Sequence, residues 1–150
     1  MPPTRRVWDS CTIINYLAGR QVAADCKLII DQAERGELEI VVSVFAEAEV
    51  VKLDGELQQD SEALIREFFG RKYIIRAALD VPVATLVRDL VRNNRGLKPY
   101  DAIHIATALH HNIPILETYD EGMIKLGAGK EGNLPLIIRK PTCEGMRPLF

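Results

Sequence analysis

Four acidic side chains, set far apart along the chain, are the groups with the clearest chemical potential. Each follows a predicted strand or lies in the first turns of a predicted helix, and these places border the binding crevice of a parallel α/β sheet. Carboxylates crowded into one crevice repel one another unless cations lie among them, and hard oxygen ligands favour Mg²⁺ or Mn²⁺ over zinc. The pattern therefore predicts a metal site and, as the first reaction to test, hydrolysis of a phosphodiester. The four residues are Asp9, Glu49, Asp101 and Asp120.

Each acid taken alone also has a purely structural explanation. Asp9 could be the N-cap of the helix that follows it. Asp101 would lie in a first helical turn, where the positive end of the helix dipole favours an acid. Asp120 could mark a turn with Gly122. The argument for a site therefore rests on the joint placement of the four acids at one edge of one sheet.

The second acid has a competitor. Ser43 ends a predicted strand and is a plausible N-cap, so both Glu47 and Glu49 fall on the helix that follows. Residues two apart point to different sides of a helix, so only one of the two can face a given crevice. We expect Glu49 to be that residue, although the sequence leaves Glu47 open.

Strands and helices alternate along the chain, which predicts a parallel sheet with crossover connections. Apolar runs suited to buried strands occur at Val7-Trp8, 38–42, 73–75, 113–116 and 134–138. Helices are expected at about 11–18, 22–35, 44–54, 57–70, 83–95, 99–111 and 121–127.

The length of 150 residues and the ordinary composition, with 47% hydrophobic and 27% charged residues, are typical of one globular domain. We expect residues 1–150 to form that domain, with 141–150 as an irregular tail whose Leu149 and Phe150 dock on its body. No apolar run approaches the ~20 residues of a membrane span, and the N-terminus lacks the apolar core of a signal peptide, so a cytoplasmic protein is expected. The three cysteines are widely spaced, which argues against a disulfide framework or a thiolate zinc site.

Four segments together resemble a known family. They read "VWDSCTIINYL", "SVFAEAEVV", "YDAIHIATAL" and "PILETYD", in that order. This series resembles the PIN domain, and specifically the compact VapC-type toxins of toxin–antitoxin systems, from Val7 to Ile138. The resemblance implies a three-layer α/β/α sandwich whose central parallel sheet has about five strands in the order 3-2-1-4-5.

The resemblance also implies an activity and partners. Members of this kind are Mg²⁺- or Mn²⁺-dependent endoribonucleases, so RNA is the expected substrate, and a protein antitoxin and a homodimer are the expected partners. By the same resemblance all four acids are catalytic, and three of them, Asp9, Asp101 and Asp120, bind the metal. Ser10 and Thr118 match polar neighbours of the first and last acids and are candidates for substrate binding.

Basic residues offer a second, weaker signal for the substrate. Lys98, close to Asp101, is the best-placed candidate to bind a substrate phosphate. Arg88, Arg92 and Arg95 fall on one face of the predicted helix 83–95, which is either an ordinary solvated face or a surface that attracts phosphates.

Two departures from the family pattern leave the substrate contacts open, namely Cys11 in place of a polar residue and Glu117 before the threonine. A catalytically silent PIN-like module that binds RNA or protein is the main alternative. A phospho-receiver or a haloacid-type phosphatase fits less well, because the second acid that each needs near Asp9 is missing. A histidine-based ribonuclease would use His104, His110 or His111, and it should survive chelation, unlike a metal enzyme.

Overall fold

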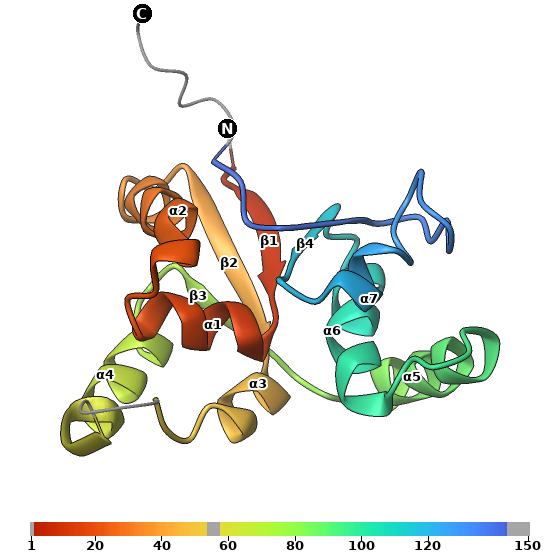
Figure 1. Cartoon of the computed structure of the whole chain (residues 1–150), viewed down its shortest axis with the longest axis horizontal. Coiled ribbons are helices and arrows are strands. Elements are labelled where there is room, and N and C mark those ends of the chain that lie inside the picture. The colour runs from red at the N-terminus through yellow and green to blue at the C-terminus, as the bar shows by residue number, and fades with distance from the viewer. Residues whose placement is uncertain (1, 54–57, 144–150) are drawn as a thin grey trace, which may run out of the picture.

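A computed structural model shows five parallel strands in one sheet, in the order β3-β2-β1-β4-β5 (Figure 1). The structure describes residues 2–53 and 58–143. The expected strand order 3-2-1-4-5 is thereby confirmed. The strands are β1 (Thr4–Trp8), β2 (Leu38–Ser43), β3 (Ile74–Ala77), β4 (Ile115–Glu117) and β5 (Ile137–Arg139).

The sheet divides the apolar side chains between two cores. Successive residues of a strand point to opposite faces, so Trp8 packs in one core and Val7 in the other. On β2, Ile40 and Val42 join Trp8, while Val41 joins Val7. Strands buried on both faces must be apolar throughout, and this is why the sequence shows continuous apolar runs rather than alternation.

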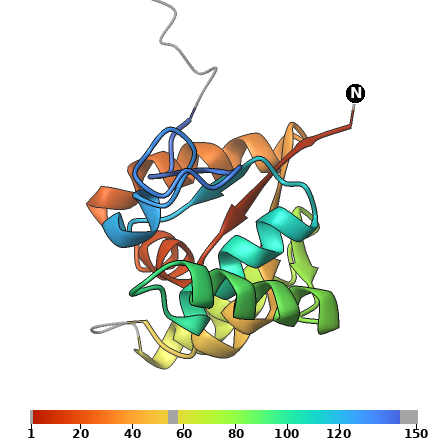
Figure 2. The same cartoon turned by 90° about the vertical axis from the view of Figure 1, so that its right-hand side faces the viewer.

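Helices cover both faces of the sheet and give the expected three layers. The first core is closed by α1, α2 and α4, and the second by α5, α6 and α7 (Figure 1). Figure 2 turns α5 and α6 toward the viewer, in front of the sheet. The helices are α1 (Ser10–Leu17), α2 (Ala24–Glu34), α3 (Val44–Glu49), α4 (Gln58–Phe69), α5 (Val81–Asn93), α6 (Pro99–His110) and α7 (Glu121–Ile124), with a 3₁₀ turn at Gln21–Ala23.

One helix is much shorter than the sequence predicts. Instead of running to residue 54, α3 ends at Glu49, and Val50 leaves the helical conformation with φ −88° and ψ 83°. Val50 and Leu53, which follow the helix, are both buried in the first core. The early end of α3 also leaves Glu49 as its last residue, close to the C-terminal edge of the sheet.

Residues 140–143, which follow β5, form no helix or strand, and the remainder of the expected tail lies outside the described residues. The backbone of Thr142 is tied to Glu117 of β4, whose carboxylate accepts from the Thr142 N–H at 3.1 Å. The expected docking of Leu149 and Phe150 lies outside the described residues. Within the described ranges, the structure has no helix with the length and apolar character of a membrane span.

Candidate active site

The four acids come together in a small hollow of about 180 Å³, which we call the acid hollow. It lies at the carboxyl ends of the neighbouring strands β1 and β4. This is the topological switch point of the sheet, where parallel α/β sheets usually bind their ligands. Asp9, Glu49, Asp101 and Asp120 all line it, and the rest of its wall comes from Ser10, Cys11, Tyr100 and His104.

Asp9 is both a helix cap and a buried carboxylate. It caps α1, and its Oδ1 accepts from the backbone N–H of Thr12 at 3.0 Å and from the Thr12 hydroxyl at 2.8 Å. Its Oδ2 accepts from the hydroxyl of Thr118 at 2.5 Å. The side chain is only 4% exposed. The cap explanation and the site explanation are therefore compatible, because the cap fixes the carboxylate at the edge of the hollow.

Thr118 does not lie where direct substrate binding would require. Its side chain is fully buried behind Asp9 and is not part of the wall of the acid hollow. Its hydroxyl donates to Asp9 and accepts from the backbone N–H of Asp120 at 3.0 Å. This position suits a residue that orients the two acids, and it does not support the contact with substrate that the sequence suggested.

Asp120 is the N-cap of α7. Its Oδ1 accepts from the backbone N–H groups of Gly122 at 2.8 Å and Met123 at 3.3 Å. Both bonds fall on the same oxygen, so Oδ2 keeps its lone pairs for a further partner. A side chain at position 122 would approach this Oδ1 to 3.1 Å, which explains why glycine suits that position.

Glu49 is held at the acid hollow by two side chains. Ser10 donates to its Oε1 at 2.5 Å, and Nε2 of His104 lies 3.3 Å from the same oxygen. Burial alone would raise the pKa of the Glu49 carboxyl, but the hydrogen bonds from His104 and Ser10 lower this pKa below its usual value. Glu49 is therefore ionised at neutral pH.

Glu47 points elsewhere, which resolves the choice between the two glutamates. Its carboxylate pairs with the guanidinium of Arg76 on β3, with both oxygens 3.2 Å from Nη1. Glu47 is not part of the wall of the acid hollow, whereas Glu49 is. The expected spacing argument holds, because residues two apart on α3 face different surroundings.

Asp101, in the first turn of α6, is influenced by the charges of the other three acids. Burial raises the pKa of the Asp101 carboxyl, and the neighbouring charges of Asp120, Asp9 and Glu49 raise it further, while His104 acts in the opposite direction. Such mutual repulsion is what a bound cation would relieve.

The donor set fits a hard divalent cation. Asp9, Asp101 and Asp120 offer carboxylate oxygens on one shared wall, and hydrogen bonds from Thr12, Thr118 and the α7 backbone orient two of them. Hard oxygen ligands with such supporting bonds are typical of Mg²⁺ and Mn²⁺ sites. Among the residues that the structure describes, however, the side chains are not drawn together closely enough to form a three-ligand metal site.

Cys11 and the two histidines at the end of α6 are poorly suited to catalysis at the acid hollow. Burial and the charge of Asp9 raise the pKa of the Cys11 thiol, so the reactive thiolate is disfavoured. His110 and His111 pack against each other at the end of α6 and do not line the hollow. His104 does line it, three residues after Asp101 on the same helix face, and that spacing is the sequence signal from which its place could have been found.

The basic residues that the sequence suggested for phosphate binding lie in two different places in the structure. Lys98 and Arg95 line a second hollow, of about 430 Å³, that shares Tyr100, Asp101 and Asp120 with the acid hollow. Arg95 lies beyond the end of α5 and not on its helical face. Arg88 and Arg92 do line that helix and are not part of either hollow.

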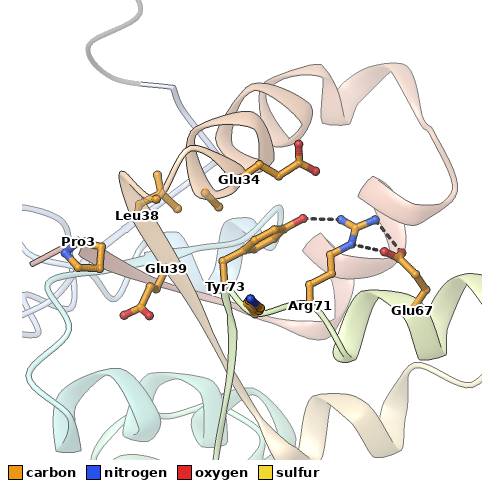
Figure 3. A pocket seen from close by; sticks show the side chains of 10 residues that line it. Pro3, Glu34, Leu38, Glu39, Glu67, Arg71 and Tyr73 are labelled. Carbon is orange, nitrogen blue, oxygen red and sulfur yellow. Dashed lines mark hydrogen bonds and ion pairs between the residues drawn. The ribbon is translucent and has the colours of Figure 1, made fainter.

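Another hollow, of about 520 Å³, lies at the opposite edge of the sheet, where β2 begins and β3 follows Tyr73 (Figure 3). Its central cation, Arg71, is already satisfied: it pairs with Glu67 at 2.8 Å and donates to the hydroxyls of Tyr73 and Tyr16. The pKa of Arg71 is raised, chiefly because its hydrogen bond to Glu67 outweighs the cost of burial. These contacts join α4 to β3 and to α1, and they place no chemical group at the acid hollow.

The geometry agrees with comparisons to known proteins. Residues 6–129 match the PIN domain family. Similar folds occur in the structure of VapBC2 from Rickettsia felis bound to a DNA fragment from their promoter (TM-score 0.64, 11% identity, 91% of this chain and 98% of that chain) and in a toxin–antitoxin complex from Klebsiella pneumoniae (TM-score 0.60, 21% identity, 89% and 99%). FitAcB from Neisseria gonorrhoeae is also similar (TM-score 0.58, 17% identity, 91% and 97%). No curated protein sequence matches the chain.

Proposed function

Because the chain belongs to the PIN domain family, we propose that it is a metal-dependent endoribonuclease that acts as the toxin of a type II toxin–antitoxin system. The observation that carries this proposal is the convergence of four acids from four separate segments on one hollow at the switch point of the sheet. A fold needs no such convergence of like charges, which costs stability unless a cation offsets it.

The roles of the four acids follow from their surroundings. Asp9, Asp101 and Asp120 would hold Mg²⁺ or Mn²⁺, with Asp9 at the centre because both of its oxygens are held in place. When bound there, such a cation would supply polarisation of a phosphodiester and so favour attack by water. Glu49, kept ionised by Ser10 and His104, orients the attacking water and accepts its proton.

The partners are part of the same proposal. One structural neighbour is a toxin–antitoxin complex, and another is VapBC2 on promoter DNA. We infer by analogy that this chain binds a protein antitoxin and forms a homodimer. Co-purification of the chain with the product of an adjacent small reading frame, and loss of RNA cleavage in that complex, are the expected results.

RNA cleavage by the purified protein tests the enzymatic part. With Mg²⁺ or Mn²⁺ the wild type should cut RNA internally, and EDTA should stop the reaction. Asp9→Asn should abolish cleavage without unfolding the protein, because asparagine also caps helices well. Asp89→Asn, the same change at an exposed position on α5, is the matched control and should cleave normally.

Two outcomes would contradict the proposal. Cleavage that persists in EDTA would favour a histidine mechanism instead, with His104 as the candidate. A wild type that binds RNA but never cuts it would identify a silent binding module.

A further inference from the structure

The hollow next to the acid hollow contains groups that the four acids do not explain. We call it the flanking hollow; it holds about 430 Å³ and shares Tyr100, Asp101 and Asp120 with the acid hollow. Its other wall carries two cations, Arg95 and Lys98. The flanking hollow is therefore continuous with the acid hollow, but its far wall is positively charged.

Tyr100 stands at the junction of the two hollows. It lines both, and it is 43% exposed although it is a large aromatic residue in the first turn of a helix whose next turns are almost fully buried. An exposed aromatic ring beside a site for phosphate chemistry is a suitable platform for stacking a nucleobase, because every base has a π-face.

The backbone brings the two cations to the rim of the flanking hollow. Gly96 has φ +87°, a conformation that side-chain-bearing residues rarely adopt, and it turns the chain between α5 and α6. Lys98 is the extended residue before α6, and its Nζ lies 5.7 Å from the centre of the Tyr100 ring. Arg95 forms no ion pair with any residue in the ranges 2–53 and 58–143.

The two cations can offset electrostatic repulsion between the acids and an RNA substrate. A polynucleotide that approaches four carboxylates is repelled by them, and the phosphate next to the one being cleaved is not neutralised by a cation in the acid hollow. Arg95 and Lys98 are exposed on flexible side chains, so they can reach such a phosphate at small cost.

We propose that the flanking hollow binds one nucleotide of single-stranded RNA beside the cleaved bond, with its base stacked on Tyr100 and its phosphate held by Arg95 and Lys98. This inference rests on the proposed nuclease function. It adds that the substrate must be unpaired at this nucleotide, because a base within a duplex is already stacked and cannot lie on the ring.

Binding of a fluorescein-labelled RNA hexanucleotide, measured by anisotropy in Ca²⁺, tests the subsite separately from cleavage. Tyr100→Leu should weaken binding about tenfold, while Tyr100→Phe should stay within about twofold of wild type, because stacking needs the ring and not the hydroxyl. Arg95→Ala should weaken binding and reduce its dependence on salt. Arg92→Ala removes the same charge outside the hollow and should change neither.

Equal affinity of Tyr100→Leu and wild type, or equal affinity of the wild type for the hexanucleotide and for its duplex, would overturn the subsite. Cleavage in Mn²⁺ is scored separately. A wild type that shows the expected Tyr100 dependence of binding but leaves the RNA uncut would support the subsite while overturning the nuclease proposal. Circular dichroism of each variant shows that a loss of binding does not reflect unfolding.

Discussion

Nε2 of His104 lies 3.3 Å from Oε1 of Glu49, and the Ser10 hydroxyl donates to that same oxygen. Because an ionised carboxylate oxygen only accepts, Nε2 of His104 is the donor in this contact. The other ring nitrogen, Nδ1, is buried without a hydrogen-bond partner among the described residues. Two donors on Oε1 leave Oε2 of Glu49 with its lone pairs available, so His104 acts as a positioning residue.

Substitution of His104 should lower the rate of RNA cleavage more than the affinity for RNA. His104→Leu keeps most of the side-chain volume but removes the donor, and we expect kcat to fall about tenfold with KM nearly unchanged. His104→Gln retains an N–H at similar reach and should recover part of the rate. Steady-state kinetics on a short RNA measure both, and equal rates for His104→Leu and wild type would rule out the positioning role.

The two glutamates of α3 provide a matched pair. Glu49→Gln removes a charge from the acid hollow, and we expect it to reduce cleavage about 100-fold, at the lower end of general acid–base contributions. Glu47→Gln removes the same charge two residues away, where the partner is Arg76, and should leave cleavage unchanged. Single-turnover cleavage of one labelled RNA compares them directly. A larger loss in Glu47→Gln would show that the wrong glutamate has been placed at the site.

Thr118 should act on the metal through the acids it contacts. Thr118→Val is nearly isosteric and removes the hydroxyl that donates to Asp9 and accepts from Asp120. Loss of such a supporting bond typically costs about 10- to 100-fold in metal affinity or activity. The Mn²⁺ concentration for half-maximal cleavage should rise accordingly.

Thr107→Val is the control for this substitution. Thr107 is equally buried, but its hydroxyl donates to the Ile103 carbonyl at 2.7 Å within α6 and touches none of the four acids. Its Mn²⁺ dependence should match wild type. If both valine variants shift together, the effect reflects the loss of a buried hydroxyl in general and not orientation of the acids.

The parts of the fold that sequence predicts well are those set by periodicity. The helix expected at 83–95 is α5, where Val83 and Leu90 are buried and Leu86 and Val87 pack partly against the second core. The predicted extent of α3, to residue 54, was wrong: the helix ends at Glu49, and Val50 and Leu53 beyond it pack against residues distant in sequence. Helix propensity contains no information about such tertiary contacts.

At the site, too, local sequence patterns predict some features, and contacts between distant segments decide the others. The four acids could be chosen from their places after strands and in first helical turns, and the strand order came from the family resemblance. The partners of these acids could not be chosen, because the hydrogen bonds of Thr118 to Asp9 and of His104 to Glu49 join segments 109 and 55 residues apart in sequence. Glu117 was noted only as unusual, and its role depends on a cluster of buried donors that no local pattern shows.

Glu117 is fully buried and accepts hydrogen bonds from three residues, two on β1 and one in the C-terminal segment. Its carboxylate binds Nη1 of Arg6 at 2.9 Å, Nε1 of Trp8 at 2.9 Å and the backbone N–H of Thr142 at 3.1 Å. It thereby connects β1, β4 and the C-terminal segment directly beneath the strand ends that position Asp9.

Replacement of Glu117 should destabilise the protein because these three donors lose this acceptor. Glu117→Leu removes this acceptor from all three donors and leaves Arg6 its 2.7 Å bond to the Thr142 carbonyl. Because it also breaks a buried ion pair, we expect a loss of about 3–5 kcal/mol in the free energy of unfolding. Glu121→Leu, which removes only the exposed pair with Lys140, should change this free energy by at most about 1 kcal/mol. Urea denaturation followed by circular dichroism measures both, and similar losses would show that the buried cluster contributes little.

Glu117→Gln should distinguish the effect of the hydrogen-bond acceptor at this position from the effect of its charge. Burial raises the pKa of Glu117 despite the opposing effects of Arg6 and Trp8, so the folded state holds this proton to a higher pH than the unfolded chain does. The stability that Glu117 contributes is therefore greatest below the unfolded pKa of about 4.3 and declines as the pH rises through the raised folded pKa. Glutamine cannot titrate, so wild type should lose stability relative to Glu117→Gln as the pH increases from about 4 toward 7. Urea denaturation of the two proteins across this range gives the difference directly, and a difference that grows in favour of wild type would show that the ionised pair with Arg6 dominates instead.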